Sequence, residues 1–145
     1  EKIDIVQETI NSYEYLSKRT SKKINFTQDV PNYSIFLNLN STLHSWCIEN
    51  LVKNATDAMK GEGEIHLNII ETPSSVQIFL TDTGCGIEKN KIKKIFEPGF
   101  STKKRGWGLG LSLTKRIVKD YHSGKIKVYN TELNKGTTFL ITYKK

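Results

Sequence analysis

The sequence has little cysteine and no long apolar run. Cys47 and Cys85 are the only cysteines among 145 residues, in neither a Cys-x-x-Cys pair nor a metal-like spacing. A disulfide framework or a zinc site is therefore not expected, and a reducing, cytoplasmic setting fits. No apolar stretch approaches the roughly 20 residues of a membrane span, and no signal-like leader is present. Because the chain begins at Glu1 rather than Met, we expect a cytoplasmic piece of a longer protein, without membrane contact of its own; whether the parent is membrane-anchored stays open.

Repeats and low-complexity tracts are also absent, so 145 residues with 37% apolar and 26% charged composition predict one compact domain. The net charge of +7 calls for an anionic partner: nucleic acid, an acidic membrane surface, an acidic protein or nucleotide phosphates. Much of this charge lies at Lys89, Lys91, Lys93, Lys94, Lys103, Lys104 and Arg105. A solvated surface explains the first four lysines equally well. Aromatic residues do not interleave with these cations, which disfavours direct nucleic-acid binding.

Hydrophobic periodicity predicts alternating helices and strands. Strand-like patterns cover residues 23–29, 33–39, 65–69, 76–80, 125–130 and 137–143. The third and fourth of these should form an antiparallel hairpin. Helical spacing covers residues 3–20, 41–60 and 109–121, the last with a stripe of Leu109, Leu113, Ile117 and Tyr121. This order predicts a two-layer α/β sandwich, with helices covering one face of a mixed, largely antiparallel sheet.

The predicted helix at residues 41–60 carries a polar stripe. Asn50, Asn54 and Asp57 recur at positions i, i+4 and i+7, beside an apolar arc that includes Leu51. A carboxamide oxygen is a hard ligand, suited to a cation such as Mg²⁺ that takes few protein groups. Two asparagines on an arbitrary helix are more often plain exposed residues, so the stripe alone identifies no site.

A first glycine segment follows the strand that ends at Leu80. Asp82 comes directly after that strand, and Gly84 and Gly86 let the backbone bend beside Ile87 and approach a flat ligand closely. Asp and Gly also form ordinary turns at strand ends, so this segment alone is a weak signal.

Residues 82–108 then lose their periodicity, and long loops in compact domains are usually functional. Phe96 and Phe100 could anchor this segment on the core while Thr102 and Lys103 face an anion, with the lysine acting as a point charge.

A second glycine segment, Gly106-Trp107-Gly108-Leu109-Gly110-Leu111, opens the helix expected at residues 109–121. Glycine at a helix N-terminus exposes backbone N–H groups to an anion. The segment differs from a Walker loop because no Gly-Lys-Ser/Thr follows, and from a Rossmann fingerprint because no βαβ unit encloses it.

Taken together and in this order, the segments resemble the nucleotide site of the Bergerat-fold ATP-binding superfamily, most closely the catalytic domain of sensor histidine kinases. The resemblance covers roughly residues 40–142 and ends in a last motif, Gly136-Thr137-Thr138-Phe139. It implies that residues 21–145 are the ATP-binding catalytic domain, with an ATP lid, and that residues 1–20 are a linker helix or the end of an upstream dimerisation domain.

The resemblance also implies roles for single residues. Asn54 would coordinate the Mg²⁺ that bridges the phosphates of ATP, and Asp82 would accept a hydrogen bond from the exocyclic amino group of adenine. Thr137 or Thr138 would help to hold adenine, with the choice between them open. Asn50, Asn54 and Lys103 are the implied catalytic residues. The other implied nucleotide contacts are Asp57, Gly84, Gly86, Ile87, Thr102, Lys103, Gly106, Gly108, Leu109, Gly110 and Leu111.

Asn50 favours a kinase over a hydrolase. ATPases of this fold resemble one another in placing a water-activating Glu four residues before the Mg²⁺-binding Asn, and here that position is Asn50. Without a carboxylate there, activation of water is weakened, whereas a neutral imidazole is already a nucleophile. Glu49, one residue earlier, should point elsewhere on the helix.

The histidine that would accept the phosphoryl group is not evident. His44, His66 and His122 are not followed by an acidic residue, and His44 is expected to be exposed near a helix start. The resemblance therefore implies an upstream dimerisation and histidine-phosphotransfer domain, in a homodimer, and a response regulator receiver domain as partners. Two alternatives stay open: a protein serine kinase of the anti-sigma-factor type, and a non-catalytic basic docking module.

Overall fold

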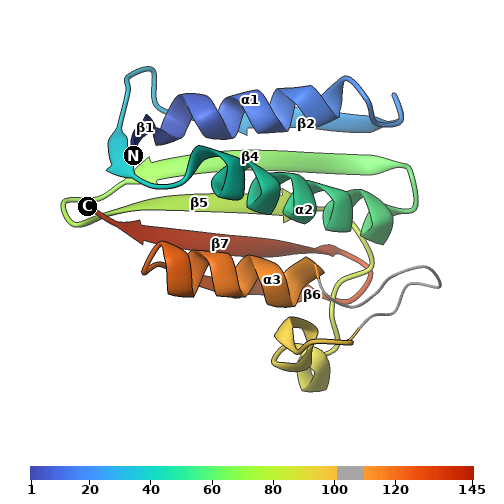
Figure 1. Ribbon diagram of the computed structural model, residues 1–145. Coiled ribbons are helices and arrows are strands. Elements are labelled where there is room, and N and C mark those ends of the chain that lie inside the picture. The colour runs from blue at the N-terminus through green and yellow to red at the C-terminus, as the bar shows by residue number, and fades with distance from the viewer. Residues whose placement is uncertain (101–109) are drawn as a thin grey trace.

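The structure, a computed structural model, describes residues 1–100 and 110–145. Figure 1 shows a layer of helices lying across a sheet. The helical elements are α1 (Ile5–Ser17), α2 (Ser41–Met59), the short turns η1 (Lys89–Lys91) and η2 (Lys94–Phe96), and α3 (Gly110–Arg116), which continues as a π-helical turn, η3 (Ile117–Tyr121). The strands are β1 (Lys2–Asp4), β2 (Ile24–Asp29), β3 (Phe36–Asn38), β4 (Gly63–Glu71), β5 (Ser75–Asp82), β6 (Lys125–Glu132) and β7 (Gly136–Lys144). None of the helices in these two ranges is long and apolar enough to cross a membrane.

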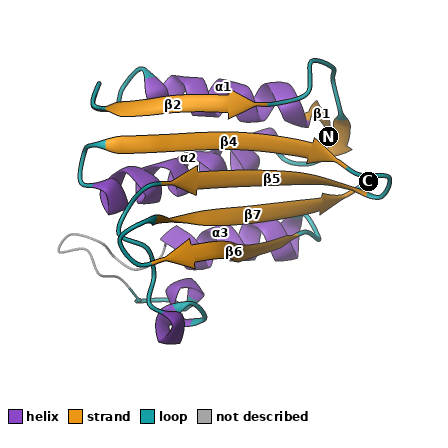
Figure 2. Ribbon diagram, turned by 180° about the vertical axis from the view of Figure 1, so that it is seen from behind, coloured by secondary structure: helices purple, strands orange, loops and turns teal. Residues whose placement is uncertain are grey.

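The main sheet has the strand order β2-β4-β5-β7-β6. β2 runs parallel to β4, whereas β4, β5, β7 and β6 pair antiparallel in succession. Figure 2, seen from behind, has the strands in front of the helices, so the helices cover one face of the sheet only. The predicted two-layer arrangement and its mixed, largely antiparallel sheet are confirmed, as is the hairpin of β4 and β5.

Alternation along β5 delivers one polar side chain to the covered face of the sheet. Val76, Ile78 and Leu80 are buried, while the residues between them are half-buried. Successive side chains of a strand point to opposite faces. Asp82 continues the buried series at the end of β5, so its carboxylate arrives beneath the helical layer rather than in solvent.

The strand expected at residues 33–39 is shorter than predicted and lies outside the main sheet. Only Phe36–Asn38 form a strand, and it pairs antiparallel with β1. Asp4 explains this diversion, because its Oδ1 accepts the N–H groups of Val6, at 3.2 Å, and of Ile35, at 3.2 Å. One carboxylate thus caps α1 and ties the incoming chain beside β1.

The first helix is present as expected and is packed into the main core. Ile5, Val6 and Leu16 are buried, and α1 lies against α2. The hydroxyl of Tyr13 lies 2.7 Å from the carbonyl oxygen of Thr27 and 3.0 Å from that of Ile65. In this chain α1 therefore belongs to the same core as the sheet; its relation to an upstream domain stays a prediction.

His44 is buried, so the expectation that it is exposed is wrong. Its Nε2 lies 2.8 Å from Thr9 Oγ1 and its Nδ1 lies 3.0 Å from the hydroxyl of Tyr143. Burial lowers its pKa to about 3, with a smaller contribution from His122. The cause is tertiary: α1 and β7 both meet the first turn of α2, which encloses a side chain that the helix alone would expose. A neutral, fully buried imidazole cannot receive a phosphoryl group from outside.

The apolar stripe predicted for the helix at residues 109–121 is only partly correct. Ile117 is buried, but Leu113 is 38% exposed and Tyr121 is 69% exposed, while Thr114 and Val118 are buried instead. Leu109 lies outside the described residues. Leu113 precedes η3, and it is exposed because Thr114, which accepts a hydrogen bond from Asn50 of α2, faces the core instead. The π-helical turn η3 then changes the number of residues per turn, so a stripe drawn at constant spacing leaves the packed face at Tyr121.

Candidate functional site

The polar stripe of α2 lies on the side that meets α3 and the first glycine segment. Asn50 and Asn54 are half-buried and Asp57 is exposed. Asn50 donates from Nδ2 to Thr114 Oγ1 of α3 at 3.0 Å. Ala58, one turn after Asn54, accepts the N–H of Cys85 at 3.1 Å through its carbonyl oxygen. The second half of α2 is therefore fixed beside the segment that follows β5.

Asp82 is a buried carboxylate with backbone donors around it. It is 5% exposed, and its Oδ1 accepts the N–H of Gly84 at 2.8 Å. Burial raises the pKa of Asp82, and the N–H groups of Gly84 and Thr137 partly offset that rise. The carboxylate is thus an acceptor in a low-dielectric position, where a further N–H donor from a ligand gains more than it would in water.

The glycine segment is wedged between α2 and the turn that joins β6 to β7. A Cβ on Gly84 would lie 2.7 Å from the backbone of Ala58, and a Cβ on Gly86 would lie 2.3 Å from the carbonyl oxygen of Glu132. Gly86 also has a φ of +75°, which L side chains rarely adopt. On the outer side, Asn134 donates its N–H to the carbonyl oxygen of Cys85 at 2.8 Å. Only glycine permits both close approaches, so the segment owes its place to main-chain contacts.

The structure separates the two threonines between which the sequence could not choose. Thr137 is buried, on the same alternating face of β7 as Phe139, and its N–H contacts the Asp82 carboxylate. Thr138 points to the opposite face, where its hydroxyl pairs with that of Thr81 at 2.9 Å. Thr137 therefore shares a face with Asp82 and Thr138 does not.

Thr131 is a site residue that the sequence reasoning missed. Its Oγ1 accepts the N–H of Ile87 at 2.9 Å and lies 2.8 Å from Thr137 Oγ1. It sits opposite Thr137 in the β6–β7 register. A signal was available, because two threonines that flank a short turn are opposed when the turn closes a hairpin.

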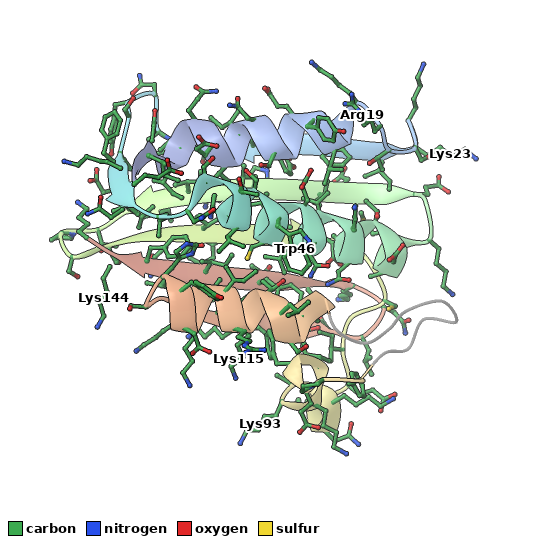
Figure 3. All side chains as sticks on the ribbon, viewed as in Figure 1. Arg19, Lys23, Trp46, Lys93, Lys115 and Lys144 are labelled. Carbon is green, nitrogen blue, oxygen red and sulfur yellow. The ribbon has the colours of Figure 1, made fainter. Side chains whose placement is uncertain are left out.

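The segment after Ile87 is anchored by an aromatic contact, as expected. The rings of Phe96 and Phe139 meet edge to face with centroids 6.3 Å apart, and Phe100 is partly buried against the same core. Lys89, Lys93 and Lys94 are exposed, and Figure 3 shows Lys93 extending away from the molecule. These lysines form a solvated face.

Several predicted site residues lie outside the described residues, namely Thr102, Lys103, Gly106, Gly108 and Leu109. Gly110 and Leu111 begin α3, and Leu111 is partly buried against the core. Among the described residues, the structure brings Asp82, Gly84, Gly86, Ile87 and Thr137 together, and joins Asn50 to α3.

A comparison with protein families identifies this arrangement. The family model described as histidine kinase-, DNA gyrase B- and HSP90-like ATPase matches residues 42–145. The chain belongs to this family. The matched residues include α2, the first glycine segment, α3 and the β6–β7 hairpin, which together form the site described above.

The known proteins that resemble this chain include histidine kinases. The signal transduction histidine-protein kinase AtoS of Escherichia coli is 36% identical over 107 residues, which are 73% of this chain and 17% of AtoS. The chain therefore spans about a fifth of the length of the curated relatives it matches. A solved catalytic domain of histidine kinase ThkA is 28% identical, with a TM-score of 0.89, covering 100% of this chain and 97% of that one. The structure of ThkA in complex with the response regulator protein TrrA is 25% identical, with a TM-score of 0.85, and the match covers 100% of this chain and 41% of that chain.

Proposed function

We propose that this domain binds Mg²⁺-ATP and transfers the γ-phosphoryl group to a histidine on a separate dimerisation domain of a two-component sensor kinase. The observation that carries the proposal is the buried Asp82 carboxylate, held at the end of β5 between a glycine segment and α2. Membership of the ATPase family and similarity to sensor kinases such as AtoS support it.

Adenine recognition follows from the chemistry of Asp82. An ionised carboxylate accepts hydrogen bonds and cannot donate them. It suits the exocyclic amino group of adenine, whereas guanine presents a carbonyl oxygen at that ring position. Because Thr137 lies on the same face and its hydroxyl is held by Thr131 at 2.8 Å, we assign the adenine contact to Thr137 rather than Thr138.

The phosphates would lie toward α2 and the start of α3. Among the described residues no three His, Cys, Asp or Glu side chains converge into a preformed metal site. Mg²⁺ commonly binds few protein groups and completes its shell with phosphates and water, so the half-buried carboxamide of Asn54 fits as its protein ligand. When bound, the ion would neutralise phosphate charge. Asp57, Lys103 and the glycines from Gly106 to Gly110 remain proposed contacts on this side.

The same geometry favours transfer over hydrolysis. Asn50 occupies the position of a water-activating carboxylate, but a carboxamide is not a base and cannot take a proton from an attacking water. Its Nδ2 donates a hydrogen bond to Thr114 Oγ1 at 3.0 Å. A neutral imidazole nucleophile needs no such base, since phosphoryl transfer is mostly positioning and charge stabilisation.

The acceptor histidine and the next partner would come from outside this domain. His44 is buried, and His122 Nε2 accepts the N–H of Asn40 at 3.1 Å. We propose the parent's own dimerisation and histidine-phosphotransfer domain as the acceptor and a response regulator receiver domain as the next partner. The ThkA complex with TrrA is a precedent in a similar protein.

The test is the chemical nature of the phosphorylated product. The chain is incubated with γ-labelled Mg²⁺-ATP, alone and with the parent's histidine-containing domain. Label should appear only when that domain is supplied, on the partner, and should be acid-labile as expected of a phosphoramidate. Acid-stable label on a serine would instead support a serine kinase, and no transfer at all would contradict the proposal.

A further inference from the structure

A directed chain of hydrogen bonds joins α2 to the first residue of α3. Asn50 Nδ2 lies 3.0 Å from Thr114 Oγ1, which lies 2.8 Å from the carbonyl oxygen of Gly110. A hydroxyl has one proton to donate. Since a carbonyl can only accept, Thr114 donates to Gly110 and accepts from Asn50, and the order of the three groups is fixed.

The other side of the same amide is packed against α3. A Cβ on Gly110 would lie 2.7 Å from Asn50 Oδ1. Thr114 is fully buried, and its carbonyl oxygen lies 4.0 Å from Cys47 Sγ, one turn before Asn50 on α2. The Asn50 amide thus fills the space between the helices, and glycine at position 110 makes that space available.

We propose that Asn50 and Thr114 form a positioning latch, which sets the first turn of α3 against the turn of α2 that carries Asn54. The latch rests on the proposed function, and it changes the role of Asn50 from a residue that touches the nucleotide or its metal ion to one that acts through α3. Asn54 follows Asn50 by one helical turn, about 6 Å along the axis, so a shift of α3 changes the surroundings of Asn54 directly.

The latch should affect phosphate binding more than adenine binding. The Asp82 carboxylate is held by different groups, the N–H groups of Gly84 and Thr137. Removing the Thr114 hydroxyl therefore leaves the adenine contacts in place while it frees α3 to move relative to α2.

The experiment uses the whole chain and two probes, Mg²⁺-ATP and adenosine, which lacks phosphates. Thr114→Val keeps the volume but removes the hydroxyl, and Thr114→Ser keeps the hydroxyl. Thr114→Val leaves the Asn50 donor unpaired, which favours arrangements in which α3 has moved away from α2. We therefore expect it to weaken Mg²⁺-ATP binding about tenfold, with adenosine affinity changed less than about twofold. Thr114→Ser should restore most of the loss.

Asn50→Leu separates the latch from direct contact with the metal ion. A latch predicts that Asn50→Leu matches Thr114→Val and that the double variant is no worse than either single variant. If Asn50→Leu weakens Mg²⁺-ATP binding while Thr114→Val does not, Asn50 contacts the ligand itself and the latch is wrong. Equal losses for Mg²⁺-ATP and adenosine would indicate general loosening of the fold, which also overturns it.

These outcomes are distinct from failure of the proposed function. A wild-type chain that binds neither probe contradicts the proposed function and the latch with it. A wild-type chain that binds Mg²⁺-ATP, together with an unchanged Thr114→Val variant, overturns only the latch.

Discussion

Near Asp82, main-chain atoms hold Cys85 and Gly86 of the glycine segment in place. Cys85 bonds through its N–H to Ala58 and through its carbonyl oxygen to Asn134, and Gly86 approaches the backbone of Glu132. At the junction of α2 and α3, side chains make the contacts, from Asn50 to Thr114. The first kind of contact survives most side-chain replacements and fails when a Cβ intrudes. The second kind depends on single polar atoms, so one hydroxyl can alter it.

Gly86→Ala should have the largest effect, because it disrupts the close main-chain packing of the glycine segment. A φ of +75° and a Cβ 2.3 Å from the Glu132 oxygen combine strain with overlap, and we expect a loss of about 3–5 kcal/mol in the free energy of unfolding. Denaturant titration measures it.

Gly61→Ala is the matched control for Gly86→Ala. Gly61 has a φ of +88° with nothing within 4 Å of a Cβ, so that variant should lose only about 1 kcal/mol. Equal losses in the two variants would show that conformation alone, and not close packing of the segment, explains the glycine at position 86.

Asp82→Asn should remove adenine selectivity without unfolding the chain. An amide oxygen can still accept the Gly84 N–H, but the new NH₂ group cannot accept from adenine. We expect ATP affinity to fall about 10- to 100-fold, because a hydrogen bond to a charged group contributes about 1.5–3 kcal/mol. Calorimetry with ATP and GTP measures it, with the exposed Asp29→Asn as control. Undiminished, selective ATP binding would remove Asp82 from the adenine site.

The raised pKa of Asp82 predicts a pH dependence of adenosine binding. Burial raises this pKa above the ordinary 3.8, and only the ionised carboxylate is a full acceptor. Adenosine affinity is therefore present above the raised pKa and should fall by up to about tenfold per pH unit below it. Adenosine is the probe because the phosphates of ATP titrate themselves. The same profile in Asp82→Asn would assign the titration to another group.

Thr131→Val is the smallest of the expected effects. It removes the hydroxyl that accepts the Ile87 N–H and supports Thr137, so we expect ATP affinity to fall by about threefold to tenfold. Thr138→Val, on the other face of β7, should change it less than about twofold. If the order of these two variants is reversed, the choice of Thr137 over Thr138 is wrong.

The sequence predicts the fold better than it predicts the tertiary contacts of single residues. Strands, helices and their order can be predicted from local hydrophobic periodicity. The mixed sheet and the β4–β5 hairpin follow from that order. Thr137 could not be preferred from the sequence because Phe139, Leu140 and Ile141 are all apolar, so alternation in β7 is hidden. Thr131 could have been found from the sequence by pairing the threonines on either side of the predicted turn, and the register of β6 and β7 pairs it with Thr137.

His44 and Leu113 show what local patterns miss. His44 is enclosed by α1 and β7, which are distant in sequence, so position near a helix start carries no information on its burial. Leu113 is exposed because Thr114, which accepts a hydrogen bond from Asn50 of α2, turns the neighbouring face of α3 toward the core. Such contacts arise only when elements pack together.

The proposed function depends first on the binding of adenine nucleotides by Asp82 with the help of Mg²⁺. The most direct measurement is calorimetric titration of the chain with ATP and GTP, with and without Mg²⁺. We predict selective binding of ATP that strengthens with Mg²⁺. Equal binding of GTP, or no nucleotide binding by a well-folded chain, would contradict adenine recognition by Asp82.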